Sequence, residues 1–272
     1  MPMLTPLIEF VRRHPRLLVL TGAGCSTQAG IADYRDADGA WKRSAPMRYQ
    51  LFVGDDVSRR RYWARSMVGW RTMAHARPTD AHHALVRLEG SGHVRLLVTQ
   101  NVDGLHDKAG SKAVIDLHGR IDTVCCLACG QRSARGHLQQ QLIGRNPSWA
   151  TLDALSAPDG DADLEGLDFA QFDVPDCPAC GGMLKPDVVF FGDNVPKTRV
   201  GAVTMAIDEA AGLLVIGSSL MVYSGFRFAE YAYQRGKPVM AINLGKTRAD
   251  HLLAAKVEQD CGEFLGGLDL IA

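Results

Sequence analysis

Short, mainly apolar runs are the feature that most limits what this chain can fold into. Their residues are continuous rather than alternating, which is typical of parallel strands buried on both faces. The expected strands are residues 17–20, 94–98, 114–117, 213–216 and 239–242. Stretches with helical spacing separate them, at 81–88 after a cap at Thr79 or Asp80, at 200–210 and at 226–233. This alternation predicts an α/β protein with a Rossmann-like, doubly wound parallel sheet.

Two Cys-x-x-Cys pairs predict a metal site. Cys126 and Cys129 form the first pair, Cys177 and Cys180 the second, while Cys25, Cys125 and Cys261 are isolated. Four thiolates suit one tetrahedral zinc ion, and a closed four-thiolate site makes that zinc structural. The alternative is a pair of redox motifs.

The segment between the two cysteine pairs has an unusual charge. Residues 146–176 contain no Lys or Arg but eight acids, namely Asp153, Asp159, Asp161, Asp163, Glu165, Asp168, Asp173 and Asp176. We interpret 120–186 as an inserted zinc-ribbon module with this acidic stretch as its loop. A helical insertion and cofactor loop is expected over 36–78. The Rossmann-like domain then comprises 1–35, 79–119 and 187–272.

Composition and charge narrow the function classes. Thirty basic and thirty acidic residues give a net charge of zero, so no global basic field exists to bind nucleic acid or an anionic membrane. No apolar run approaches the ~20 residues of a membrane helix. The first strand begins at residue 17, which leaves no room for a signal peptide. We expect a cytoplasmic protein without membrane or nucleic-acid partners, and its oligomeric state is left open.

Glycines follow the first expected strand in the run Thr21-Gly22-Ala23-Gly24-Cys25-Ser26. Glycines let the backbone approach a diphosphate, and the N–H groups at the start of a following helix stabilise its charge. The fingerprint is incomplete, because Thr27 stands where its third glycine would fall. A tight strand–helix turn is an equally good interpretation of this run alone.

Polar or small residues follow the other expected strands as well. They are the runs 99–106, 118–119, 217–220 and 243–245. Ligands of open α/β sheets bind beyond the carboxyl ends of strands, so these residues predict a site. His118 has an ordinary pKa near neutrality and is the candidate general base. The alternatives are turn chemistry at 101–104 and a structural role for His118.

Taken together, these motifs resemble those of the sirtuin family, the NAD-dependent protein lysine deacylases. The matching elements are Gly22-Ala-Gly-x-Ser26, Gly30-Ile31-x-Asp33-Tyr34-Arg35, Thr99-Gln-Asn-Val-Asp103, Leu117-His118-Gly119, both cysteine pairs, Lys185-Pro-Asp-Val-Val-Phe-Phe-Gly192, Gly217-Ser-Ser219 and Asn243-x-Gly245. They extend from about Leu17 to Cys261. The stretches 62–65, 157–161 and 222–225 are most similar to the class II branch.

The resemblance implies a reaction in which NAD is a co-substrate and acyl-lysine lies beside it, in a cleft between the two domains. The acyl oxygen attacks the ribose carbon that bears nicotinamide, and nicotinamide leaves. The base then deprotonates a ribose hydroxyl, whose oxygen attacks the imidate carbon. Water finally releases the free lysine and O-acyl-ADP-ribose.

The resemblance also assigns roles residue by residue. Catalysis is assigned to His118 as general base and to Asn101. NAD binding is assigned to Gly22, Ala23, Gly24, Ser26, Gly30, Asp33, Tyr34 and Arg35 on the phosphate side, to Gln100, Asn101, Val102 and Asp103 around nicotinamide and its ribose, and to Gly217, Ser218, Ser219, Asn243, Leu244, Gly245 and Cys261 around adenosine. The substrate backbone is expected to add as a strand along Val189, Phe190, Phe191 and Gly192 and along Val222, Tyr223 and Ser224.

Departures from the family pattern bear on the acyl group. Ala32 and Ser224 stand where the family usually has proline, and Asp193 replaces a more common glutamate. Tyr62 and Arg65 are spaced to share a helix face, like the Tyr-x-x-Arg pair that holds acidic acyl groups in class III sirtuins. The alternative is that Arg65 belongs to a solvated basic face that includes residues 59–61.

Two rival functions remain. One is a mono-ADP-ribosyltransferase or NAD glycohydrolase that uses the same cofactor residues. The other is a non-catalytic zinc-ribbon module that binds a partner such as DNA, which the neutral charge and the acidic segment disfavour.

Overall fold

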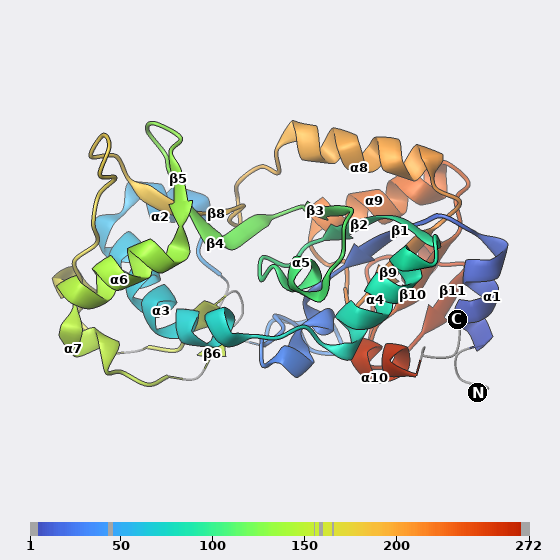
Figure 1. Cartoon of the computed structure of the whole chain (residues 1–272), viewed down its shortest axis with the longest axis horizontal. Coiled ribbons are helices and arrows are strands. Elements are labelled where there is room, and N and C mark those ends of the chain that lie inside the picture. The colour runs from blue at the N-terminus through green and yellow to red at the C-terminus, as the bar shows by residue number, and fades with distance from the viewer. Residues whose placement is uncertain (1–4, 43–45, 155, 158–159, 165, 268–272) are drawn as a thin grey trace.

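The chain forms two lobes side by side in the computed structural model (Figure 1). The structure describes residues 5–42, 46–154, 156–157, 160–164 and 166–267. One lobe contains a six-stranded parallel sheet, and the other is built around a three-stranded antiparallel sheet. No helix among these described residues is both long enough and apolar enough to span a bilayer.

The parallel sheet has the strand order β11-β10-β9-β1-β2-β3. Its strands are β1 (Leu17–Thr21), β2 (Val94–Thr99), β3 (Val114–Asp116), β9 (Leu213–Ile216), β10 (Val239–Ile242) and β11 (Ala255–Val257). All five expected strands are confirmed, and every pairing in this sheet is parallel. Strand β11 was not expected, because a strand of three residues is too short to show a recognisable hydrophobic pattern.

Helices cover both faces of the parallel sheet, as the continuous apolar strands predict. The odd residues of β1, such as Val19, pack with α1 (Thr5–Arg13), α4 (Asp80–Gly90) and α10 (Cys261–Gly266). Its even residues, such as Leu20, pack with α8 (Lys197–Glu209) and α9 (Tyr223–Gln234). The fold class is therefore a doubly wound α/β sheet, and all three expected helices are present.

The second lobe has its own core. Its sheet is β5-β4-β8, formed by β4 (Gly119–Cys126), β5 (Arg132–Ala134) and β8 (Leu184–Val188). Helices α2 (Tyr49–Gly54), α3 (Asp56–His75) and α6 (Arg135–Arg145) surround it. Phe52 and Trp63 share one apolar cluster with Val124 and Phe172. The expected insertion at 36–78 and the expected module at 120–186 thus contribute to one core, and their division into separate units stays a prediction.

The acidic segment contains short elements rather than a plain loop. They are α7 (Pro147–Ala150), the β6–β7 hairpin (Ser156–Ala157 and Asp161–Ala162), and the 3₁₀ turn η5 (Phe169–Gln171). Asp159 and Glu165 lie outside the described residues. The arrangement places this segment against the arginine-rich helix α3.

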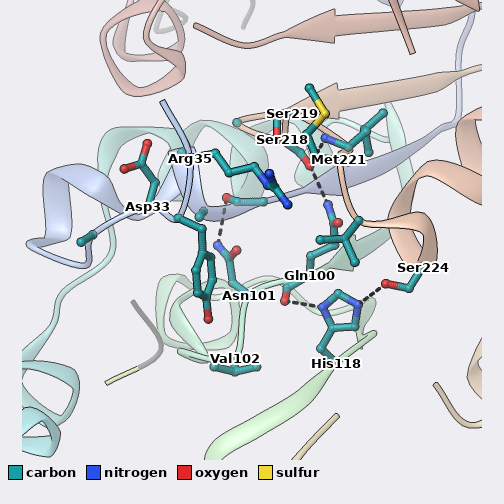
Figure 2. A pocket seen from close by; sticks show the side chains of 18 of the residues that line it. Asp33, Arg35, Gln100, Asn101, Val102, His118, Ser218, Ser219, Met221 and Ser224 are labelled. Carbon is teal, nitrogen blue, oxygen red and sulfur yellow. Dashed lines mark hydrogen bonds between the residues drawn. The ribbon is translucent and has the colours of Figure 1, made fainter. Parts of the chain in front are cut away.

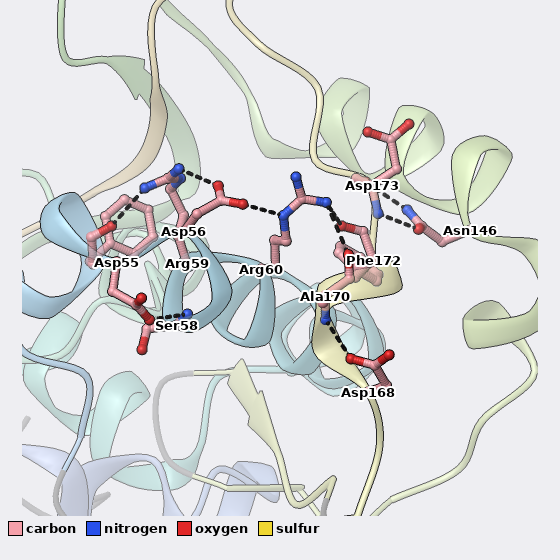
Figure 3. A network of polar contacts seen from close by, with 11 residues as sticks. Asp55, Asp56, Ser58, Arg59, Arg60, Asn146, Asp168, Ala170, Phe172 and Asp173 are labelled. Atoms are coloured by element: carbon pink, nitrogen blue, oxygen red, sulfur yellow. Dashed lines mark hydrogen bonds and ion pairs between the residues drawn. The ribbon is translucent and has the colours of Figure 1, made fainter.

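Arginines on α3 hold the acidic segment in place (Figure 3). Arg60 donates to the carbonyl of Phe172 at 2.8 Å, and Asp56 one turn earlier accepts from the Arg60 Nε at 2.6 Å. Beyond the helix, Arg145 pairs with Asp173 at 2.9 Å. Arg60 of the basic run therefore binds the acidic stretch through its backbone carbonyls, and Arg145 binds it through a carboxylate.

Candidate active site

One large cavity lies where the two lobes meet. Its volume is about 860 Å³, and its walls come from the ends of β1, β2, β9 and β10, from the loop after β8, and from the start of α9. The predicted residues that line it are Gly22, Ala23, Gly24, Gly30, Asp33, Tyr34, Arg35, Gln100, Asn101, Val102, His118, Val189, Phe190, Phe191, Gly192, Gly217, Ser218, Ser219, Val222, Tyr223, Ser224, Asn243, Leu244 and Cys261. Parallel strands explain this gathering, since their carboxyl ends share one edge of the sheet.

The glycine loop, residues 22–26, needs its glycines because the loop after β9 presses against it. A Cβ on Gly24 would lie 2.9 Å from the Cα of Gly217, and one on Gly22 would lie 2.7 Å from the Cβ of Ser218. The prediction of a helix after these glycines is wrong. The chain makes two short 3₁₀ turns, η2 (Ala23–Cys25) and η3 (Thr27–Ala29), instead.

A buried polar network supports this loop and begins at Asn101 in the cavity wall (Figure 2). Asn101 donates to the Gly22 carbonyl at 3.0 Å and to the Ser26 hydroxyl at 3.1 Å. Ser26 donates in turn to Asp103 at 2.7 Å, and the second carboxylate oxygen of Asp103 accepts from the Leu105 N–H at 2.8 Å. Burial raises the pKa of Asp103. In the described part of the chain, Ser26 and Asp103 therefore support the wall rather than line the cavity. Contact of Asp103 with nicotinamide stays a prediction.

Buried histidines form a second layer beneath the glycine loop. His106 lies 2.9 Å from the Thr21 hydroxyl through its Nε2, and the Thr79 hydroxyl donates to the Cys25 carbonyl at 2.8 Å. His82 contacts His106 with ring centroids 4.5 Å apart and ring planes tilted by 48°. Burial lowers the pKa of His82 to about 4, so both rings are neutral supports. His106 ended the predicted polar run 99–106, but a supporting role for it and for His82 was not predicted.

The cofactor loop, residues 30–42, is tied together by its own side chains. Arg35 donates to the Gly39 carbonyl at 2.6 Å and stacks on Trp41, with its guanidinium carbon 3.8 Å from the ring centroid. Trp41 also meets Phe191 edge-on at 5.7 Å. Trp41 therefore connects the cofactor loop to Phe191 in the predicted substrate segment.

His118 is fixed at both ring nitrogens. Its Nδ1 lies 2.9 Å from the Gln100 carbonyl oxygen, and its Nε2 lies 2.8 Å from the Ser224 hydroxyl (Figure 2). Burial is the main cause that lowers the pKa of His118, and the charges of Arg199 and Arg227 lower it further, against the Gln100 carbonyl, which raises it. The ring is therefore neutral near pH 7, the state that a general base needs.

Gly119, directly after this histidine, is required by its backbone conformation and by close packing. Its φ is +85°, and a Cβ would lie 2.0 Å from the Asp187 carbonyl. The glycine lets β4 turn away from the sheet edge directly after His118.

The expected adenosine contacts are mostly at the cavity. Of the residues that the structure describes, Gly245 alone in this group is absent from the wall. Its φ is +87°, and a Cβ there would lie 2.4 Å from the Ala37 carbonyl, so its role is to let the cofactor loop approach. Cys261 lines the cavity and donates to the Gly24 carbonyl at 3.2 Å.

The predicted substrate segments are residues 189–192 and 222–224. In the second segment only Val222 has an extended backbone. Val222 has φ −83° and ψ 125°, whereas Tyr223 and Ser224 form the first turn of α9. The expectation that all three residues pair with a peptide strand therefore needs correction for Tyr223 and Ser224. The helix begins here because Gly225 and Phe226 both donate their N–H groups to the Val222 carbonyl.

The expected acyl contact of Tyr62 and Arg65 is also corrected. Arg65 donates from Nε and Nη2 to both carboxylate oxygens of Asp161 at 2.9 Å. Tyr62 is enclosed by the rings of Phe52, Trp63 and Phe190, at centroid distances of 5.1 to 5.4 Å. Neither residue lines the cavity within the described ranges. Their helical spacing directs them to the β6–β7 hairpin and the core instead.

Replacing Arg65 with methionine is expected to lower stability rather than change acyl preference. The bidentate pair is only partly exposed and should contribute about 1 kcal/mol. A double-mutant cycle with Asp161→Asn, followed by thermal unfolding, measures that coupling. The kcat/KM values for acetyl, glutaryl, methylglutaryl and lipoyl peptides should all change by the same factor. A selective loss on the acidic acyl groups would return Arg65 to the substrate site.

Several lining residues were not predicted. They include Trp41, Lys42, Met221, Arg227 and Asp260. Lys42 pairs with Asp33 at 2.5 Å across the cofactor loop. Trp41 and Lys42 lie six and seven residues after the predicted Arg35, and this proximity was the available signal, whereas Met221 and Arg227 carry none that sequence alone reveals.

The four paired cysteines form a metal-sized cluster. Their sulfur atoms all lie within 4.8 Å of one another, with Cys126 3.5 Å from Cys180 and Cys129 3.8 Å from Cys177. A tetrahedral zinc with Zn–S bonds of ~2.3 Å separates its sulfurs by ~3.8 Å, so the geometry fits zinc. Each pair is followed by a glycine with positive φ that closes the turn, Gly130 and Gly181. Zinc would supply structure here, not catalysis, because four thiolates close its coordination.

Comparisons with known proteins agree with this geometry. The Sir2 family sequence model matches residues 22–224. The chain is 58% identical over 262 residues to NAD-dependent protein deacetylase 2 of Bradyrhizobium diazoefficiens, covering 96% of each chain. It is also 58% identical to the NAD-dependent protein deacetylase of Xanthomonas campestris pv. campestris, covering 96% of this chain and 89% of the relative.

Solved structures show the same fold with ligands bound. A Sir2 complex with a p53 peptide and NAD+ has a TM-score of 0.76 and 26% identity, covering 96% of this chain and 95% of the other. Sir2Tm bound to a propionylated peptide has a TM-score of 0.74 and 28% identity, covering 96% of this chain and 95% of the other. With its parallel sheet, its four-cysteine cluster and a family match over most of its length, this chain belongs to the Sir2 family.

Proposed function

We propose that this protein is an NAD-dependent protein lysine deacylase that transfers the acyl group to ADP-ribose and releases nicotinamide. The observation that carries this proposal is the placement of a neutral His118 in the same cavity as the glycine loop and the substrate segment. NAD, when bound, supplies the ribose carbon that the acyl oxygen attacks.

The glycine loop and the cofactor loop fit the diphosphate half of NAD. Gly22 and Gly24 line the cavity with their backbone, and Arg35 lines the same cavity with a positive charge. Backbone N–H groups and an arginine together stabilise a diphosphate. Trp41 holds the Arg35 side chain in place, which limits the entropy lost when a ligand binds.

Gln100 and Asn101 fit the nicotinamide ribose because they lie between the glycine loop and the base. Gln100 is itself held by the Thr21 carbonyl and the Ser218 hydroxyl, at 3.1 and 2.8 Å. The backbone carbonyl of Gln100 accepts from His118. The imidazole ring and the side-chain amides of Gln100 and Asn101 are therefore all held in place by hydrogen bonds. Such fixed geometry is what proton transfer from a ribose hydroxyl requires.

Acyl-lysine fits as the second substrate, with its peptide backbone along the substrate segment. Three backbone groups of this segment are engaged internally: the Val189 N–H donates to the His118 carbonyl, and the Phe190 and Phe191 carbonyls accept from Asp193 and Tyr49. The bond between Asp193 and Phe190 closes a turn in which Gly192 has a φ of +80°, so only Val189 continues directly from β8 beside His118. Strand addition at this position would read the acyl-lysine more than its flanking sequence. The cytoplasmic location and the lack of membrane or nucleic-acid partners stay predictions.

A panel of acyl-lysine peptides with NAD, followed by mass spectrometry, tests the proposal. We expect deacylated peptide, nicotinamide and O-acyl-ADP-ribose in equal amounts, because each turnover consumes one NAD. ADP-ribosylated protein without deacylated peptide would favour the transferase alternative. Free ADP-ribose without any peptide product would favour the glycohydrolase alternative.

A further inference from the structure

The hydrogen bonds of His118 define which of its nitrogens carries the proton. The Gln100 carbonyl oxygen can only accept, so Nδ1 at 2.9 Å from it must donate. In the neutral ring, Nε2 then holds a lone pair and can only accept. The Ser224 hydroxyl, 2.8 Å away, must therefore donate to Nε2.

Ser224 is held in that position by the fit of α9 against Gln100. Gly225, the next residue, lies so close to the Gln100 amide that a Cβ would be 2.2 Å from its Oε1. The bond from the Gly225 N–H to the Val222 carbonyl fixes the same turn. Gln100 thus binds His118 through its carbonyl and positions the serine through its side chain.

Among the described residues, two arginines are the charged groups that lower the pKa of His118. Arg199 approaches from α8, where it donates to the Leu117 carbonyl at 3.5 Å, and Arg227 lies on α9 at the cavity wall. Both disfavour the protonated ring. The ring is thus held by two neutral partners, a carbonyl and a hydroxyl, and neither compensates a positive charge as a carboxylate would.

We propose that Ser224 is a positioning residue for His118. Its hydroxyl donates to Nε2, keeps the ring in the Nδ1-protonated neutral form, and directs the lone pair at the cavity, where a ribose hydroxyl replaces the serine as donor. The inference rests on the proposed function for the role of His118 as base. Ser224 stands where the family usually has proline, which has no hydroxyl group.

Imidazole ¹⁵N spectra of the free protein, recorded across pH, test the proposal without any substrate. The His118 signal is assigned by its loss in His118→Gln. Ser224→Ala should raise the pKa of His118 by about 0.5 to 1 pH unit, because a donor to the neutral form is lost. Ser224→Thr, which keeps the hydroxyl, should restore the original value. Ser91→Ala removes a hydroxyl that donates to Leu88 on α4, outside the cavity, and should change nothing.

The acid limb of kcat/KM should move upward by the same amount in Ser224→Ala and not in Ser224→Thr. An unchanged pKa in Ser224→Ala, or a ring protonated at Nε2 in the parent protein, would overturn the proposal. Because the spectra need no turnover, they remain decisive even if the peptide panel yields no deacylation. That second result would count against the proposed function alone.

Discussion

Replacing His118 with alanine is expected to lower kcat/KM for deacylation by about 10²–10⁴-fold, which corresponds to about 3–5 kcal/mol in the barrier. The ring is the group in the cavity wall that is both neutral and equipped with a lone pair at Nε2. NAD affinity, measured by calorimetry, and the unfolding temperature should remain close to those of the parent protein.

Exposed His83 provides the matched control for that substitution. It lies on α4 away from the cavity, so His83→Ala should retain full activity. The pH profile gives a second check. A lowered pKa keeps His118 deprotonated down to pH values below the ordinary ~6.5, so the acid limb of kcat/KM should lie below that value. Turnover at the parent rate in His118→Ala would remove this residue from the mechanism.

Replacing Cys126 with serine is expected to release the metal and destabilise the second lobe. A serine hydroxyl is a poor zinc ligand, and binding of a structural zinc contributes on the order of 10 kcal/mol to folding in small zinc modules. Cys126 and Cys177 also belong to the apolar cluster that contains Trp63, so their loss reaches α3. Zinc content by atomic absorption and thermal unfolding measure the two effects.

Adjacent Cys125 is the control for the metal site. It lies outside the cluster of four sulfurs, and its neighbour in β8 is Lys185. Cys125→Ser should keep about one zinc per chain, as a single four-thiolate site requires. If Cys125→Ser loses zinc and Cys126→Ser retains it, the assignment of ligands is wrong by one residue.

The strands, the cluster of four cysteines and the place of His118 at the cavity were predictable because each depends on local pattern. A continuous apolar run such as 17–20 specifies a buried parallel strand by itself, and the polar residues after it must then lie at one sheet edge. Cys-x-x-Cys spacing specifies a knuckle turn without reference to the rest of the chain. His118 was identified because it directly follows such a strand.

Side chains that find partners across the molecule were not predictable. Arg65 fits either an acyl carboxylate or a solvated face by spacing, and only the folded hairpin supplies Asp161 as its partner. Tyr223 and Ser224 are compatible with a strand, yet α9 begins there.

The amino-acid sequence by itself therefore determined the layered fold, the grouping of the four paired cysteines and the position of His118, the predicted base, since these follow from periodicity and short spacing. The tertiary structure alone decided which groups touch the base. Ser224 and His118 lie 106 residues apart, and their 2.8 Å contact exists only because α9 is fitted against Gln100. Contacts of that kind depend on how distant parts of the chain pack together, and a short sequence pattern does not specify that packing.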